Sequence, residues 1–204
     1  MTYDHDHDHD SDLRAPASRP LSGLLGTAAA HAVPLVHGIA DDRLGAPTPC
    51  AEYDVQGLLD HLFEVVVNFR LLAAKESADF SGTFGRLATG PGWRDRFETE
   101  TAKLVDAWAA PGAEEGTTGQ MGMPARTVGA MALLDLTVHG WDPARATGRA
   151  FAPDPAVVDE LTGVVAEPAP NARRMNVFGE PVEPPAGASA FERLLAATGR
   201  DPRA

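Results

Sequence analysis

Three side chains in the apolar parts of this sequence have the types and spacing of a metal-binding site. Asp135 and His139 are four residues apart. If this stretch is helical, their Cβ atoms lie about 5 to 6 Å apart on one face, close enough for both to reach one ion. His61 stands between Leu59 and Leu62, where burial of an imidazole without a partner would cost free energy. Together the three residues predict one site for a divalent metal ion.

Two imidazoles and one carboxylate form a three-ligand set, which leaves a coordination position open to water or a substrate thiol. Such a site is typical of catalytic metals rather than of closed structural ones. Zinc is the expected ion, with nickel or iron as alternatives. The spacing alone also fits a simpler interpretation, in which His61 is a core histidine bonded to a backbone carbonyl. Asp135 and His139 would then be an exposed pair on a helix surface.

Two further residues are candidates for supporting roles. Asn68 follows His61 by seven residues, so it is a candidate pocket residue on the same helical face, although a plain core amide fits equally well. Asp142 either accepts an imidazole N–H and fixes the tautomer of that ring, or caps a short helix that Pro143 opens. We favour the cap, because Pro143 leaves the carbonyl of His139 without its helical partner and should kink the helix there. No residue stands out as a catalytic acid or base.

Hydrophobic periodicity predicts that helices position all of these residues. We expect one helix over about 21–36, a second over 54–75, a third ending near residues 111–112 and a fourth over about 125–148. Shorter helices should begin at Pro155, after Asp154, and at the capping box of Ser189 and Glu192. Residues 54–75 are apolar almost all round and belong in the centre of a bundle. The fold class expected is therefore all-α, a four-helix bundle with short additional C-terminal helices.

Length and composition limit the classes of protein that fit. The 204 residues, 44% of them hydrophobic, predict a disordered Asp/His-rich tail at 1–20 and a single domain at 21–204. The net charge of −12 argues against a nucleic-acid partner, and no apolar run approaches the ~20 residues of a membrane span. Cys50 is the only cysteine, which is typical of a cytoplasmic protein. The oligomeric state stays open, with a homodimer as one alternative.

Three strings carry a resemblance to a known family: PTPCAEYDVQGLLDHL at 47–62, DLTVHGWDPARATG at 135–148 and FERLLAATGRDP at 191–202. In this order they resemble the actinobacterial proteins similar to the N-terminal domain of mycothiol-dependent maleylpyruvate isomerase, within the DinB-like (DinB/YfiT-like) superfamily. The resemblance implies that His61, Asp135 and His139 hold the metal. At position 135, where this sequence has Asp135, the isomerase has Glu. Trp is commoner in the family at the position of Tyr53, and Leu is usual at the position of Pro143.

The resemblance also implies a function. We expect an enzyme that uses a metal and a low-molecular-weight thiol, mycothiol, to isomerise a small electrophilic metabolite or to transfer the thiol to it. The isomerase has an additional C-terminal domain that supplies thiol contacts. The expectation that this protein uses a thiol therefore depends on the family resemblance more than the expectation of a metal does. One alternative is a non-catalytic module that binds or sequesters a metal. Another is a metal-dependent hydrolase.

Overall fold

The fold follows the predicted helices closely. A computed structural model describes residues 19–80, 86–120, 122–166 and 179–204, so the predicted tail lies almost wholly outside the described residues. The described elements are α1 (Leu21–Gly38), η1 (Asp41–Arg43), α2 (Val55–Ala73), α3 (Trp93–Ala109), β1 (Thr117–Thr118), β2 (Met123–Pro124), α4 (Ala125–Ala146), α5 (Pro155–Ala166) and α7 (Ala190–Ala197). The all-α prediction is confirmed. Sequence patterns missed the short 3-10 helix η1 and the pair of two-residue strands, which lie antiparallel just before α4.

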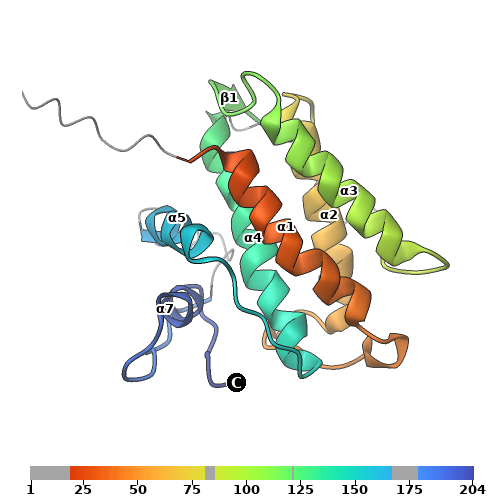
Figure 1. Cartoon of the computed structure of the whole chain (residues 1–204), viewed down its shortest axis with the longest axis vertical. Coiled ribbons are helices and arrows are strands. Elements are labelled where there is room, and N and C mark those ends of the chain that lie inside the picture. The colour runs from red at the N-terminus through yellow and green to blue at the C-terminus, as the bar shows by residue number, and fades with distance from the viewer. Residues whose placement is uncertain (1–18, 81–85, 121, 167–178) are drawn as a thin grey trace, which may run out of the picture.

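Four helices form the bundle that carries the candidate site. α1 packs against α3 and α4, and α2 packs against the same two helices, so α1 and α2 alternate with α3 and α4 around the core (Figure 1). α5 and α7 pack against each other, and α5 also contacts α4. His61 lies on α2, while Asp135 and His139 lie on α4. Because α2 and α4 are in direct contact, the bundle brings the predicted ligands to one interface.

Side-chain caps explain why several helices begin where they do. The Asp54 carboxylate accepts the backbone N–H of Gly57 at 2.8 Å and starts α2. Ser189 and Glu192 form the predicted capping box of α7. Each cap satisfies backbone N–H groups that have no partner within the helix, which is worth about 1 kcal/mol per cap. These starting points, predicted from residue type alone, are confirmed.

The prediction of a helix restart at Asp142 is wrong. α4 continues as one helix through Pro143 to Ala146, and Asp142 lies inside it rather than at an N-cap. Trp141, Pro143 and Ala144 are all buried in this stretch. A proline inside a helix costs about 3 kcal/mol, and burial of these apolar side chains offsets that cost. The carboxylate of Asp142 is engaged by other side chains, so it does not cap a helix.

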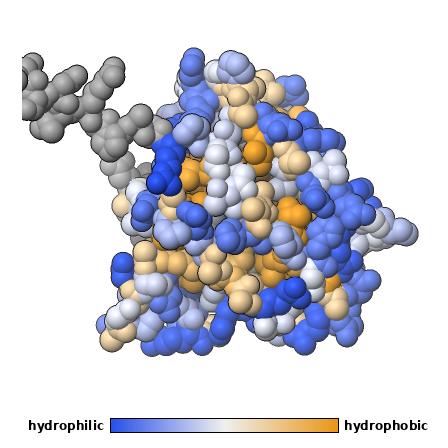
Figure 2. Space-filling view, in the orientation of Figure 1, coloured by the Kyte–Doolittle hydropathy of each residue, from blue (hydrophilic) through white to orange (hydrophobic). Residues whose placement is uncertain are grey.

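Most large apolar side chains of the described residues lie in the core. Phe80 alone among their large hydrophobic side chains is strongly exposed, at 52%. On the face drawn in Figure 2, hydrophilic residues are spread over the surface, with hydrophobic ones in smaller groups between them. In the described part of the chain, no helix is both long and apolar enough to cross a membrane.

Gly129 provides a test of how tightly the bundle is packed. A Cβ at this position of α4 would meet the Leu21 side chain and would lie 2.9 Å from the Trp108 ring. Gly129→Ala should therefore lower the free energy of unfolding by about 1–3 kcal/mol through overpacking. Gly23→Ala on α1 is the matched control, because a Cβ there meets nothing within 4 Å. It should raise the free energy of unfolding by about 0.5–1 kcal/mol, and equal effects of the two changes in denaturant unfolding would contradict this packing.

Candidate metal centre

The structure brings the three predicted ligands together at the interface of α2 and α4. One ligating atom each of His61, Asp135 and His139 lies within 4.8 Å of the others. Asp135 Oδ1 and His139 Nε2 are 3.9 Å apart. Zinc binds such atoms at about 2.0–2.2 Å, so two ligands of one tetrahedral ion are about 3.3–3.6 Å apart. The donor set fits a divalent ion, around which the three side chains would move closer together.

His139 offers a different ring nitrogen to each side of the site. Its Nδ1 lies 3.0 Å from Asp142 Oδ2, whereas its Nε2 faces Asp135. The carboxylate of Asp142 only accepts, while the guanidinium of Arg200, 3.1 Å from the same Nδ1, only donates. We assign the imidazole proton to Nδ1, because the carboxylate oxygen lies closer and itself accepts from Arg200. Nε2 then keeps its lone pair for a metal. The contacts of Asp142, which is fully buried, thus fit the orienting role toward His139 rather than the helix cap that we favoured.

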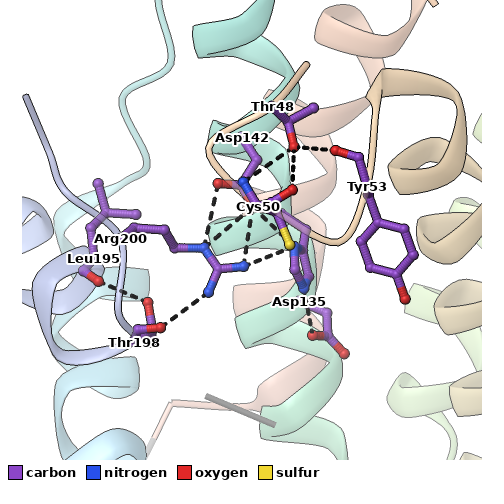
Figure 3. A network of polar contacts seen from close by, with 9 residues as sticks. Thr48, Cys50, Tyr53, Asp135, Asp142, Leu195, Thr198 and Arg200 are labelled. Carbon is purple, nitrogen blue, oxygen red and sulfur yellow. Dashed lines mark hydrogen bonds and ion pairs between the residues drawn. The ribbon is translucent and has the colours of Figure 1, made fainter. Parts of the chain in front are cut away.

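Arg200 completes the surroundings of Asp142 and was missed by the sequence analysis. Its Nη2 lies 3.1 Å from Asp142 Oδ2, and its Nε lies 3.3–3.4 Å from both carboxylate oxygens. Figure 3 shows the guanidinium reaching from beyond α7 to the carboxylate on α4. Gly199, with φ +89°, makes the turn between α7 and Arg200. The only sequence signal was membership of Arg200 in the string at 191–202.

The loop of residues 48–53, just before α2, borders the site. The Thr48 hydroxyl lies 2.7 Å from the carbonyl oxygen of Tyr53 and accepts the backbone N–H of Cys50 at 3.2 Å. The Tyr53 ring stacks on His61, with centroids 5.6 Å apart and planes 13° from parallel. His61 in turn meets His139 edge-on, with centroids 5.0 Å apart. The loop therefore helps to set the orientation of the imidazole on α2.

Burial dominates the electrostatics of His61 and Cys50. It lowers the pKa of His61 below its usual 6.5, against the opposite effect of the Asp135 charge. The neutral imidazole, which is the form that binds metals, is thereby favoured. Burial also raises the pKa of Cys50, and the nearby Arg200 charge opposes that rise. Cys50 is half-buried beside His139 and Asp142.

Two other groups of potential ligands occur among the described residues. Cys50 forms one with His139 and Asp142, but the Arg200 guanidinium already lies against both His139 Nδ1 and Asp142 at 3.1 Å. A second cation there would face this fixed positive charge, so the group is a poor metal site. The other group consists of His37 on α1 with Asp95 and Glu98 on α3, and all three side chains are exposed. His37 and Glu98 form a surface ion pair, and the group borders a hollow of about 570 Å³ that none of the three predicted ligands lines.

Of the two interpretations given for Asn68, the structure fits the core amide. Its side chain is fully buried. The amide nitrogen donates to the backbone carbonyl of Asp79 at 2.6 Å, and the amide oxygen accepts the backbone N–H of Asp79 at 3.2 Å. Two turns separate Asn68 from His61, a rise of about 10 Å along the helix. Asn68 is thus a core amide that fixes the segment after α2.

The fold and the site together define a helical bundle with a His, Asp and His set between two of its central helices. Residues 25–144 match the family model described as the mycothiol maleylpyruvate isomerase N-terminal domain. The match covers more than half of the chain, and the chain belongs to this family. The match spans nearly all of α1 to α4, including His61, Asp135, His139 and Asp142, while Arg200 lies beyond it. Neither the curated proteins nor the solved structures give a match to the chain.

Proposed function

We propose that this protein is a metal- and thiol-dependent enzyme that isomerises a small electrophilic metabolite or transfers a thiol to it. Its metal ligands are His61, Asp135 and His139, and its thiol is mycothiol. Family membership supports the kind of chemistry and the choice of thiol. The convergence of the three side chains supports the ligand set.

The observation that carries the proposal is the number of ligands. Among the residues that the structure describes, the His61 group contains three members, and Cys50 falls in a separate group with His139 and Asp142. Two imidazoles and one carboxylate leave a coordination position for an exogenous ligand. A sequestering module would instead close the shell with a fourth protein ligand. The group therefore favours an enzyme over a storage or sequestering role.

The protein side chains have separable roles in this scheme. When bound, a divalent ion would supply the positive charge that keeps a coordinated thiol deprotonated. Asp135 contributes the only negative charge among the three ligands, and its side chain is 28% exposed, so the site can be reached from solvent beside it. Asp142 and Arg200 hold the imidazole of His139 in the tautomer that leaves Nε2 free. Tyr53 and the loop that carries it hold His61.

Cobalt substitution tests the proposal through a direct spectroscopic readout. Addition of mycothiol to the cobalt-loaded protein should produce a sulfur-to-cobalt charge-transfer band, because thiolate sulfur is a preferred ligand of such ions. The alcohol analogue of the thiol should produce none. Cys50→Ser is the matched protein control and should leave the band intact.

Two results would contradict the proposal. One is the absence of a band at saturating thiol. The other is a band that is present before any thiol is added and is lost in Cys50→Ser, since Cys50 would then close the shell as in a sequestering module.

A further inference from the structure

Tyr53 is held firmly at the edge of the candidate metal centre. Its backbone N–H donates to the carbonyl of Cys50 at 3.0 Å, and its carbonyl oxygen lies 2.7 Å from the Thr48 hydroxyl. Asp54, the next residue, caps α2. The backbone on both sides of the Tyr53 side chain is thus tied to the loop and to the helix that carries His61.

The ring of Tyr53 is fixed as well as its backbone. One face stacks on His61. The ring also lies against Gly57, where an added Cβ would come within 3.2 Å of the ring carbon Cδ1. Any larger side chain at residue 57 would push the ring away from this position. Such close packing orders the ring before any ligand binds, so little conformational entropy is lost when the hydroxyl forms a hydrogen bond with a ligand.

The hydroxyl of Tyr53 is free to serve a ligand. No hydrogen-bond partner for it occurs among the described residues, and the side chain is only half-buried. Figure 3 shows the hydroxyl directed away from Thr48, toward the end of the network where the Asp135 carboxylate lies. A phenol hydroxyl is protonated at neutral pH and can donate a hydrogen bond.

We propose that the Tyr53 hydroxyl donates a hydrogen bond to an oxygen of the small molecule that binds at the His61, Asp135 and His139 centre. The site thereby selects molecules that carry a carbonyl or carboxylate oxygen. This inference rests on the proposed function, because it requires a metal at that centre. It adds the chemical class of the substrate and the residue that recognises it.

Binding of two small probes to the cobalt-loaded full chain separates this role from a structural one. Acetate presents a carboxylate oxygen to the hydroxyl, whereas ethanethiol offers no oxygen acceptor. Tyr53→Phe keeps the ring that stacks on His61 and removes only the donor. It should weaken acetate binding about tenfold, the effect of one hydrogen bond to a charged group, and should change ethanethiol binding less than about twofold. Tyr3→Phe makes the same chemical change outside the described residues and should alter neither.

The outcomes are distinguishable in the cobalt spectrum. Equal weakening of both probes in Tyr53→Phe, or no weakening of either, would overturn the proposal, since the hydroxyl would then act through the fold or not at all. A wild-type chain that binds no cobalt at His61, Asp135 and His139 would overturn the proposed function first, and this inference with it. Cobalt bound normally in both proteins with selective loss of acetate is the expected result.

Discussion

Asp135→Asn should abolish tight metal binding, whereas Asp135→Glu should retain it. The substitution by Asn keeps the size of the side chain and removes its charge. His61 and His139 are neutral donors when they bind a metal, so Asp135 supplies the only negative charge that opposes the divalent ion in this set. Loss of an outer partner alone typically costs about 10–100-fold in metal affinity. Loss of the charged ligand should cost more than about 100-fold.

Glu at position 135 should bind because the family resemblance places Glu here and because the site has room on this side. The Asp135 side chain is 28% exposed, so a longer carboxylate is not forced into a packed core. Chelator competition with zinc measures both variants. Asp106→Asn on the exposed face of α3 is the matched control and should bind zinc as wild type does.

One result would exclude Asp135 as a ligand. If Asp135→Asn kept full metal occupancy while His139→Ala lost it, the acid would be a helix-surface residue. Asp142 would then be the first alternative, although its carboxylate is already engaged by Arg200.

Asp142→Ala should have the largest effect on stability and should also weaken metal binding. Asp142 is fully buried, and Arg200 is only 11% exposed at its side chain. Removal of the carboxylate leaves the guanidinium and the His139 N–H without their acceptor. Breaking a buried ion pair by removal of one partner costs about 3–5 kcal/mol. Because His139 also loses the group that orients it, metal affinity should fall by about 10–100-fold.

A double substitution separates these two effects. Asp142→Ala combined with Arg200→Met removes both buried charges, so the free energy of unfolding of the metal-free protein should recover much of the loss. Metal affinity should stay low in the double variant, since His139 still lacks its acceptor. Asp201→Ala breaks the ion pair between the exposed side chains of Asp201 and Arg203 and should leave the free energy of unfolding almost unchanged. Unchanged metal affinity in Asp142→Ala would contradict the orienting role.

Local signals were sufficient to predict the helices, whereas the choice of His61, Asp135 and His139 as one ligand set also needed the family resemblance. Asp54, and Ser189 with Glu192, mark helix starts through hydrogen bonds within four residues, so their effect can be predicted from residue type. Asp135 and His139 are brought together by the repeat of a single helix. The position of His61 opposite them required one more inference, that two strongly apolar helices would be neighbours in the core.

The missed features depend on contacts between distant parts of the chain. Arg200 and Asp142 are 58 residues apart, and the local sequence around either residue does not predict that they form an ion pair. At Pro143, the local rule predicted a break, but burial of the surrounding side chains keeps α4 continuous. For Asn68 the helical face left a pocket residue and a core amide equally open, and the segment at Asp79 takes both of its hydrogen-bonding groups. In each case tertiary contacts decided the outcome.

The metal content of the purified full chain after dialysis against zinc tests the central claim most directly. Elemental analysis should give one zinc per chain for the wild type and for a variant in which His5, His7 and His9 are replaced by Asn. His139→Ala should give none, while the matched change His31→Ala on the exposed surface of α1 should still give one. Loss of the zinc in the variant of the three N-terminal histidines, with zinc retained in His139→Ala, would contradict the claim that His61, Asp135 and His139 hold the ion.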